Sequence, residues 1–141
     1  MNKLKLVLDT NVLLVSISSQ SSYHWLFQKL LLGAFDMCLT HDILTEYEEV
    51  ISQKWNPEIA KNVLRTLLLL PHVHQVITYY HWNLIYDDAD DNKFVDCAVS
   101  ANAHYLVTHD KHFNVLKTID FPKIEIITLN ELEKIFNSRL T

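Results

Sequence analysis

Two aspartates that follow apolar runs are the residues of this sequence best placed to do chemistry. Asp9 comes directly after an apolar run over residues 3–8, and Asp110 comes two residues after the run over residues 105–108. Such runs predict buried strands. Active sites of open α/β sheets lie just beyond the carboxyl ends of the strands. If these two strands are parallel neighbours, both carboxylates lie at one edge of the sheet.

A run of acids precedes a predicted helix over residues 92–102. Five of the 17 acidic residues fall within ten positions, namely Asp87, Asp88, Asp90, Asp91 and Asp96. Taken alone, such a run is equally typical of a solvated loop that ends in a helix cap. On a helix, Asp96 is rotated by about 140° from Asp91. Three roles are therefore open for Asp96. It completes a second metal site, it accepts a hydrogen bond that supports a ligand of the first metal site, or it is a polar residue on the flank of the helix.

The predicted helix over residues 41–55 offers a further acid. Its apolar stripe is formed by Ile43, Leu44, Tyr47, Val50 and Ile51. At helical periodicity, Glu49 points away from this stripe, whereas Glu46 and Glu48 both border it. Glu46 lies beside Val50 and is slightly favoured as the acid that reaches inward.

The charge balance determines how such a site can hold an anionic substrate. Lysines and arginines number 12 against 17 acids, for a formal charge of −5. A basic surface that binds nucleic acid by releasing counterions is therefore excluded, and an anionic substrate needs a bound cation. Clustered carboxylates without cysteine favour hard cations such as Mg²⁺ or Mn²⁺. Two such ions would bring the formal charge to −1.

The elements that must position these acids alternate along the chain. Strands are predicted over residues 3–8, 35–39, 73–78, 105–108 and 124–127, and helices over residues 10–18, 22–32, 41–55, 57–70, 92–102 and 129–136. Alternation of this kind implies a three-layer α/β/α sandwich around a central, mostly parallel sheet. The length of 141 residues predicts one domain over residues 1–141.

Composition also bears on location. No apolar run reaches the roughly 18 residues of a membrane span, and no secretory cleavage pattern follows the first residues. We therefore expect a cytoplasmic protein without a membrane partner. Cys38 and Cys97 lie in apolar surroundings and are expected to be buried thiols.

Histidines and aromatics give weaker signals. The eight histidines, among them His72, His74, His109 and His112, show no zinc-ligand spacing and are expected on the surface or in loops. An aromatic run comprises Tyr79, Tyr80, Trp82 and Tyr86. These side chains either stack on unpaired bases or pack in the core or in a dimer.

Four segments, in this order, resemble the motifs of PIN-domain nucleases, and most closely the VapC-type ribonuclease toxins of toxin–antitoxin systems. They are residues 8–11 (LDTN), 46–50 (EYEEV), 91–98 (DNKFVDCA) and 106–110 (LVTHD). The resemblance runs from the first strand to the final helix and implies a PIN-like fold. It also implies that Asp9, Glu46, Asp91 and Asp110 bind divalent metal.

The resemblance assigns roles to further residues. Thr10, Asn11 and Thr108 match positions that support the metal ligands, and an acid at the position of Asp96 is common in this branch. His109 departs from the small or basic residue expected before the last acid, which affects substrate contacts rather than metal ligands.

The function implied is that of a divalent-metal-dependent endoribonuclease that hydrolyses RNA phosphodiester bonds, with an antitoxin as partner. Bound metal would activate water and stabilise the leaving oxygen, so no Ser-His or Cys-His nucleophile is required. The alternative is a PIN-like domain without useful turnover that binds a metal or a partner. A haloacid-dehalogenase-like phosphatase would need an acid where Asn11 stands, and a response regulator would need an acid pair at the first strand.

The helices over residues 22–32 and 56–70 carry more apolar positions than one buried stripe needs. These are Trp25, Leu26, Phe27, Leu30, Leu31 and Leu67 to Leu70. An excess of this kind indicates an interface, and we expect a homodimer.

Overall fold

Strands and helices alternate along the chain in the computed structural model, which describes residues 3–86 and 88–139. Asp87 of the acidic run lies outside the described residues. The elements are β1 (Lys5–Leu8), α1 (Thr10–Ile17), α2 (His24–Leu32), β2 (Asp36–Leu39), α3 (His41–Lys54), α4 (Pro57–Leu69), β3 (Val73–Gln75), η1 (Ala89–Asp91), α5 (Asn92–Ala101), β4 (Tyr105–Val107), η2 (Lys111–Thr118), β5 (Ile126–Ile127) and α6 (Leu129–Arg139). The two elements η1 and η2 are 3₁₀ helices.

The sheet has five parallel strands in the order β3-β2-β1-β4-β5. The chain begins in the centre with β1, continues outward through β2 and β3, and then returns to the other side of β1 with β4 and β5. Leu8 at the end of β1 pairs with Val107 at the end of β4. The strand order therefore reverses between β1 and β4, and the crevice at the carboxyl ends of such strands is where α/β sheets bind ligands.

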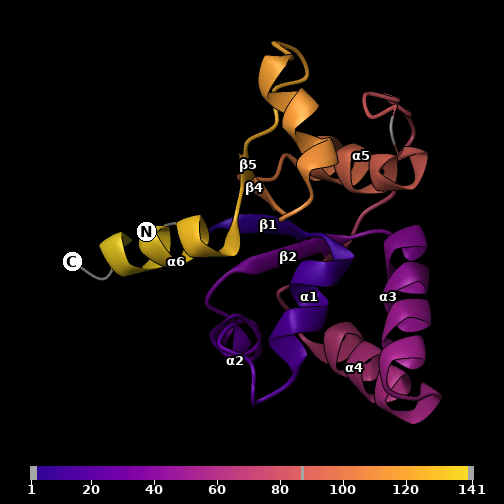
Figure 1. Ribbon diagram of the computed structural model, residues 1–141, viewed down its shortest axis with the longest axis vertical. Helices are drawn as coiled ribbons and strands as arrows, with labels where there is room; N and C mark the ends of the chain where they lie inside the picture. Colours follow the sequence, from indigo (N-terminus) through magenta and orange to yellow (C-terminus); the bar gives the residue numbers. More distant parts are fainter. Residues whose placement is uncertain (1–2, 87, 140–141) are drawn as a thin grey trace.

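Helices cover both faces of this sheet. Figure 1 shows α1, α2, α3 and α4 on one side of β1 and β2 and α5 on the other. Leu6, Val7 and Leu8 of β1 are fully buried between these layers, which accounts for the continuous apolar run. The three-layer α/β/α architecture with a parallel sheet is thus confirmed.

Polar side chains begin the helices that follow the strands. Asp9 caps α1, Thr40 caps α3 by accepting the backbone N–H of Ile43, and Asn56 caps α4 by accepting that of Ile59. Tyr47 of α3 is fully buried and donates its hydroxyl proton to the Leu8 carbonyl over 2.5 Å. This bond holds α3 against the carboxyl end of β1, beside Asp9.

The structure differs from the sequence prediction mainly after the strands. The predicted strand over residues 73–78 ends at Gln75, and the predicted strand over residues 124–127 is reduced to β5. The helix η2 was not predicted, because a 3₁₀ helix has no sustained apolar period. Within the described residues, no helix is both long enough and apolar enough to traverse a bilayer.

Candidate active site

Asp9 lies at the centre of the site, between the end of β1 and the start of α1. It is 6% exposed, and its carboxylate accepts the Thr10 backbone N–H at Oδ1 over 2.7 Å and the Thr108 hydroxyl at Oδ2 over 2.8 Å. Burial raises the pKa of Asp9, the two hydrogen bonds lower it, and the charges of Asp110 and Glu46 raise it again, so that the net shift is upward. The structure therefore holds this carboxylate in a buried environment close to two other acids.

Asp91 comes from the other side of the site, where η1 meets α5. It is 8% exposed, and among the described residues its buried Oδ2 has no hydrogen-bond partner. Burial, together with the negative charges of Asp88, Asp9 and Asp110, raises its pKa to about 7. A buried carboxylate oxygen without a partner is rare, and a missing ion is one explanation for it.

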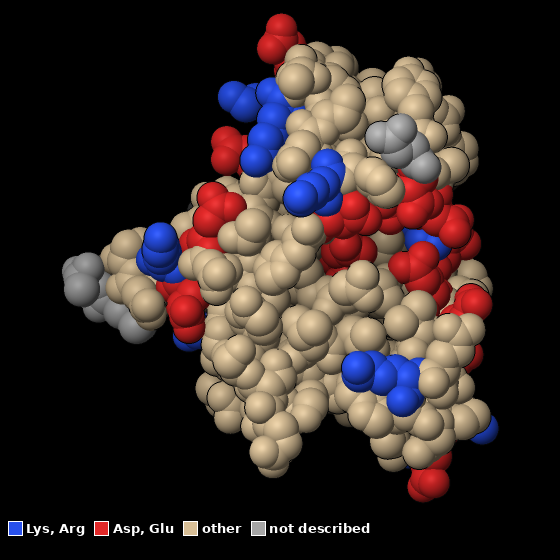
Figure 2. Space-filling view, viewed as in Figure 1, with Lys and Arg blue, Asp and Glu red and all other residues tan. Residues whose placement is uncertain are grey.

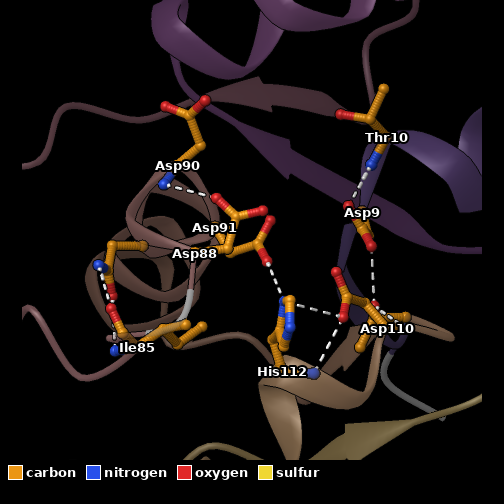
Figure 3. Close-up of polar contacts among 10 residues, drawn as sticks. Asp9, Thr10, Ile85, Asp88, Asp90, Asp91, Asp110 and His112 are labelled. Carbon is orange, nitrogen blue, oxygen red and sulfur yellow. Dashed lines mark hydrogen bonds and ion pairs between the residues drawn. The ribbon is translucent and has the colours of Figure 1, made fainter.

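Asp110 follows β4 and completes the edge of the sheet. Its backbone N–H donates to Thr108 Oγ1 over 3.0 Å, and its Oδ1 accepts the backbone N–H of His112 over 2.9 Å, which caps η2. Figure 3 shows Asp9, Asp91 and Asp110 turned toward one another from three separate segments. The predicted meeting of acids at the ends of β1 and β4 is observed.

Glu46 approaches the same site from α3. It is half-buried, and it accepts the Thr10 hydroxyl at Oε2, whereas Glu48 is exposed. Lys93 Nζ lies 2.6 Å from Glu46 Oε1. Burial acts to lower the pKa of Lys93, but the hydrogen bond and charge of Glu46 outweigh it and raise the pKa. Thus Glu46, rather than Glu48, faces the acids, and it carries a charged partner that the sequence analysis missed.

His112 is a second residue that the sequence analysis did not place in the site. Its Nδ1 lies 3.4 Å from Asp110 Oδ1 and 4.0 Å from Asp91 Oδ2. One ligand atom each from Asp88, Asp91 and His112 lie within 4.8 Å of one another (Figure 3). The available signal was its position two residues after Asp110, but only the turn of η2 directs the ring back toward the acids.

Asp96 is placed differently from the other predicted ligands. It is 4% exposed, and its carboxylate accepts the Trp82 backbone N–H at Oδ1 over 3.0 Å and lies 3.1 Å from His81 Nδ1 at Oδ2. Both oxygens thus have partners in the segment that precedes the acidic run. The metal-binding role predicted for Asp96 stays a prediction.

Three further residues that the sequence singled out make no hydrogen bond to the site carboxylates among the described residues. His109 Nε2 accepts the Leu129 backbone N–H over 3.1 Å, so its ring supports the start of α6. Asn11 is exposed on α1, and the supporting role predicted for it stays a prediction. His72 is buried rather than on the surface, with its Nε2 against the Leu30 carbonyl.

A groove of about 510 Å³ runs beside the acids, between α3 and the start of α5. Glu46, Lys93 and Asp96 line it, together with residues of the 78–83 segment. Figure 2 shows acidic side chains gathered over this junction, with most lysines and arginines elsewhere on this face.

The donor set fits a hard divalent cation. Carboxylates from four segments lie close together, one buried oxygen lacks a hydrogen-bond partner among the described residues, and burial together with neighbouring negative charges raises the pKa values of Asp9 and Asp91. Mg²⁺ and Mn²⁺ prefer oxygen ligands of this kind, whereas an imidazole nitrogen such as that of His112 suits Zn²⁺, Fe²⁺ or Ni²⁺ better.

Comparisons with known proteins find solved structures that share this fold. VapBC2 from Rickettsia felis, solved bound to a promoter DNA fragment, matches with a TM-score of 0.61 and 18% identity over 89% of this chain and 98% of that chain. VapBC-1 from nontypeable Haemophilus influenzae matches with a TM-score of 0.60 and 17% identity over 90% and 99%. The PIN domain endonuclease Utp24 matches with a TM-score of 0.52 and 16% identity over 88% and 84%.

At these identities the structural matches show a shared fold. A search of curated proteins found no match. A family model described as PIN domain matches residues 5–112, from the start of β1 to the histidine that faces the acids. The chain therefore belongs to the PIN-domain family.

Proposed function

We propose that this protein is a divalent-metal-dependent endoribonuclease and the toxin of a toxin–antitoxin pair. The observation that carries the proposal is the proximity of Asp9, Glu46, Asp91 and Asp110, with a buried Asp91 oxygen that has no hydrogen-bond partner in the described chain. Membership in the PIN-domain family and the likeness to an endonuclease and to VapBC assemblies support it.

In this proposal the four carboxylates hold Mg²⁺ or Mn²⁺, and Asp96 is a candidate for a second ion. Bound metal would activate a water molecule and stabilise the charge that develops on the phosphodiester. Bound metal would also allow RNA to bind, because the acidic groove repels the RNA phosphates until cations neutralise it.

Two threonines hold the ligands in place. Thr108 bonds to Asp9 through its hydroxyl hydrogen and to the Asp110 backbone through its oxygen. Thr10 bonds to Asp9 through its backbone and to Glu46 through its hydroxyl. Lys93 balances the charge of Glu46 at the edge of the groove, where it also faces an incoming phosphate. Each threonine thus joins two ligands from separate elements, which limits the reorganisation needed when a metal binds.

The partners proposed are RNA as substrate, an antitoxin protein and a second copy of this chain. The likeness to the VapBC2 and VapBC-1 structures supports the antitoxin. The homodimer is supported by exposed leucines at the ends of α2 and α4, namely Leu31, Leu32, Leu68 and Leu69. A strict monomer in light scattering at micromolar concentration would contradict the homodimer.

The test is cleavage of labelled single-stranded RNA by purified protein in Mg²⁺, in Mn²⁺ and in chelator. We expect cleavage only with metal, and nearly complete loss in Asp9→Asn and Asp110→Asn with an unchanged circular dichroism spectrum. Full activity of Asp110→Asn would refute the assignment. Metal-dependent stabilisation without cleavage of any RNA would instead identify the alternative, a PIN-like domain that binds a metal or a partner.

A further inference from the structure

Two exposed aromatic rings, Tyr80 and Phe121, pack on the half-buried Trp82 beside the groove. Tyr80 and Trp82 lie with their ring centroids 4.6 Å apart, and Trp82 and Phe121 with theirs 5.8 Å apart, both edge to face. Phe121 is 81% exposed and Tyr80 is 63% exposed. We call these three residues the aromatic platform. Core packing, one of the two expectations from the sequence, therefore does not apply to Tyr80.

The platform is attached to α5, the helix that begins directly after the active-site acid Asp91. Asp96 of α5 accepts the Trp82 backbone N–H, and Ser100 of the same helix donates its hydroxyl to the Ile77 carbonyl over 3.0 Å. Since α5 begins directly after Asp91, these bonds hold the segment around residues 77–82 at a set distance from the carboxylates.

The same segment continues into the groove. Thr78 and His81 line it together with Glu46 and Lys93. A strand of substrate lying in the groove would therefore contact both the ligand Glu46 and the segment from which Tyr80 and Trp82 project.

The charge of the molecule indicates what the platform binds. With 12 basic and 17 acidic residues, and with acids along the groove, contacts to phosphates supply little affinity. Stacking of bases on aromatic rings does not depend on charge and accepts any base. A protein of this charge thus needs stacking more than a basic nuclease does.

We propose that Tyr80, Trp82 and Phe121 bind unpaired bases of the RNA strand that the active site cleaves. The platform selects single-stranded substrate, because paired bases do not expose their faces. This inference rests on the proposed function for its substrate, while the contacts that form the platform are independent of it.

The test measures binding of a labelled single-stranded RNA by fluorescence anisotropy in the cleavage-deficient Asp110→Asn background. Phe121→Ala and Tyr80→Ala should each weaken binding by about 5- to 150-fold, the range for loss of one stacked base. Phe121→Trp, which keeps a ring, should restore it. Val15→Ala, which trims an exposed apolar side chain of α1, should leave the affinity unchanged.

Salt and strandedness provide further readouts. Affinity should fall by less than about tenfold between about 50 and 200 mM salt, where a protein with many phosphate contacts loses about a thousandfold or more. A duplex of the same sequence should bind weakly and be insensitive to Phe121→Ala. A steep salt dependence, or unchanged affinity in both alanine variants with unchanged melting temperatures, would overturn the proposal.

Two outcomes separate this inference from the proposed function. If the wild type cleaves RNA and the alanine variants bind and cleave equally well, the proposed role of the platform is wrong and the nuclease proposal is supported. If the variants lose RNA binding but the wild type never cleaves, base binding by the platform is supported and the nuclease proposal is wrong. Variants that alter only self-association would show that these rings form a protein interface, which also overturns the proposal.

Discussion

Thr108 donates its hydroxyl proton to Asp9 across 2.8 Å and so joins two residues that lie 99 positions apart in the chain. The bond connects the carboxyl ends of β1 and β4, which are neighbours in the sheet. The same oxygen accepts the Asp110 backbone N–H over 3.0 Å. One buried hydroxyl therefore sets the relative position of two carboxylates.

Thr108→Val removes this hydroxyl with little change in shape. We expect a loss of about 10- to 100-fold in metal affinity or cleavage, the usual effect of removing a partner of a metal ligand. Melting with and without Mn²⁺ would measure it. Thr66→Val is the matched control, because that hydroxyl donates only to the Asn62 carbonyl within α4. Equal metal responses in the two variants would contradict the role of Thr108.

Glu46→Gln and Glu48→Gln test which acid of α3 belongs to the site. Glu46 lies among the acids and pairs with Lys93, whereas Glu48 is exposed. We expect Glu46→Gln to lose at least about tenfold in cleavage and Glu48→Gln to keep the wild-type rate. Equal rates would show that Glu46 is an ordinary ion-pair partner.

Asp91 makes the stability of the metal-free protein depend on pH. Its folded pKa of about 7 lies above the ordinary 3.8, so between these values the folded state holds a proton that the unfolded state has released. The contribution of Asp91 to stability is therefore greatest at low pH and is lost as pH rises to about 7. In chelator the protein should be more stable near pH 5 than near pH 8, by roughly 1–3 kcal/mol.

Asp91→Asn should remove most of this dependence and raise the melting temperature in chelator near pH 8, although it abolishes cleavage. Added Mg²⁺ or Mn²⁺ should stabilise the wild type by mass action and the variant much less. Glu48→Gln serves as the control. Thermal melts in which the two variants behave alike, with and without metal, would show that Asp91 is not part of a common site.

Asp96→Ala distinguishes a structural role from metal binding. It leaves the Trp82 backbone N–H without its acceptor, so we expect a loss of about 1–3 kcal/mol in the free energy of unfolding. If Asp96 acts only through this segment, the metal-induced rise in melting temperature is unchanged. A smaller rise would assign Asp96 to a second metal ion, as its position on α5 first suggested.

His112→Gln tests the nitrogen ligand. Imidazole suits Ni²⁺ and not Mg²⁺, so this variant should lose more of the stabilisation induced by Ni²⁺, used as a probe ion, than of that induced by Mg²⁺. His41→Gln, at the exposed start of α3, is the control. Equal losses for the two ions would indicate that His112 does not contact the metal.

The sequence by itself determined the sheet and the positions of the acids along it. Apolar runs that end at Asp9 and shortly before Asp110 identify buried parallel strands, and the carboxyl ends of such strands share one edge. The period of the helix over residues 41–55 separated Glu46 from Glu49, because that period reflects which side faces the core. Both signals are local, because the hydrophobic pattern along a strand or helix records which of its positions are buried in protein and which face water.

Only the tertiary structure decided which side chains meet at the site. Lys93 reaches Glu46, His112 reaches Asp91, and Asp96 turns to the segment around Trp82. Each pair joins elements whose relative placement depends on packing of the whole core, and no local period encodes it. The exposure of the aromatic run was also undecided in the sequence, since Tyr and Trp are as common in cores as on binding surfaces. Their placement depends on the bonds from α5 that hold the segment at the surface, and those bonds form only once the chain is folded.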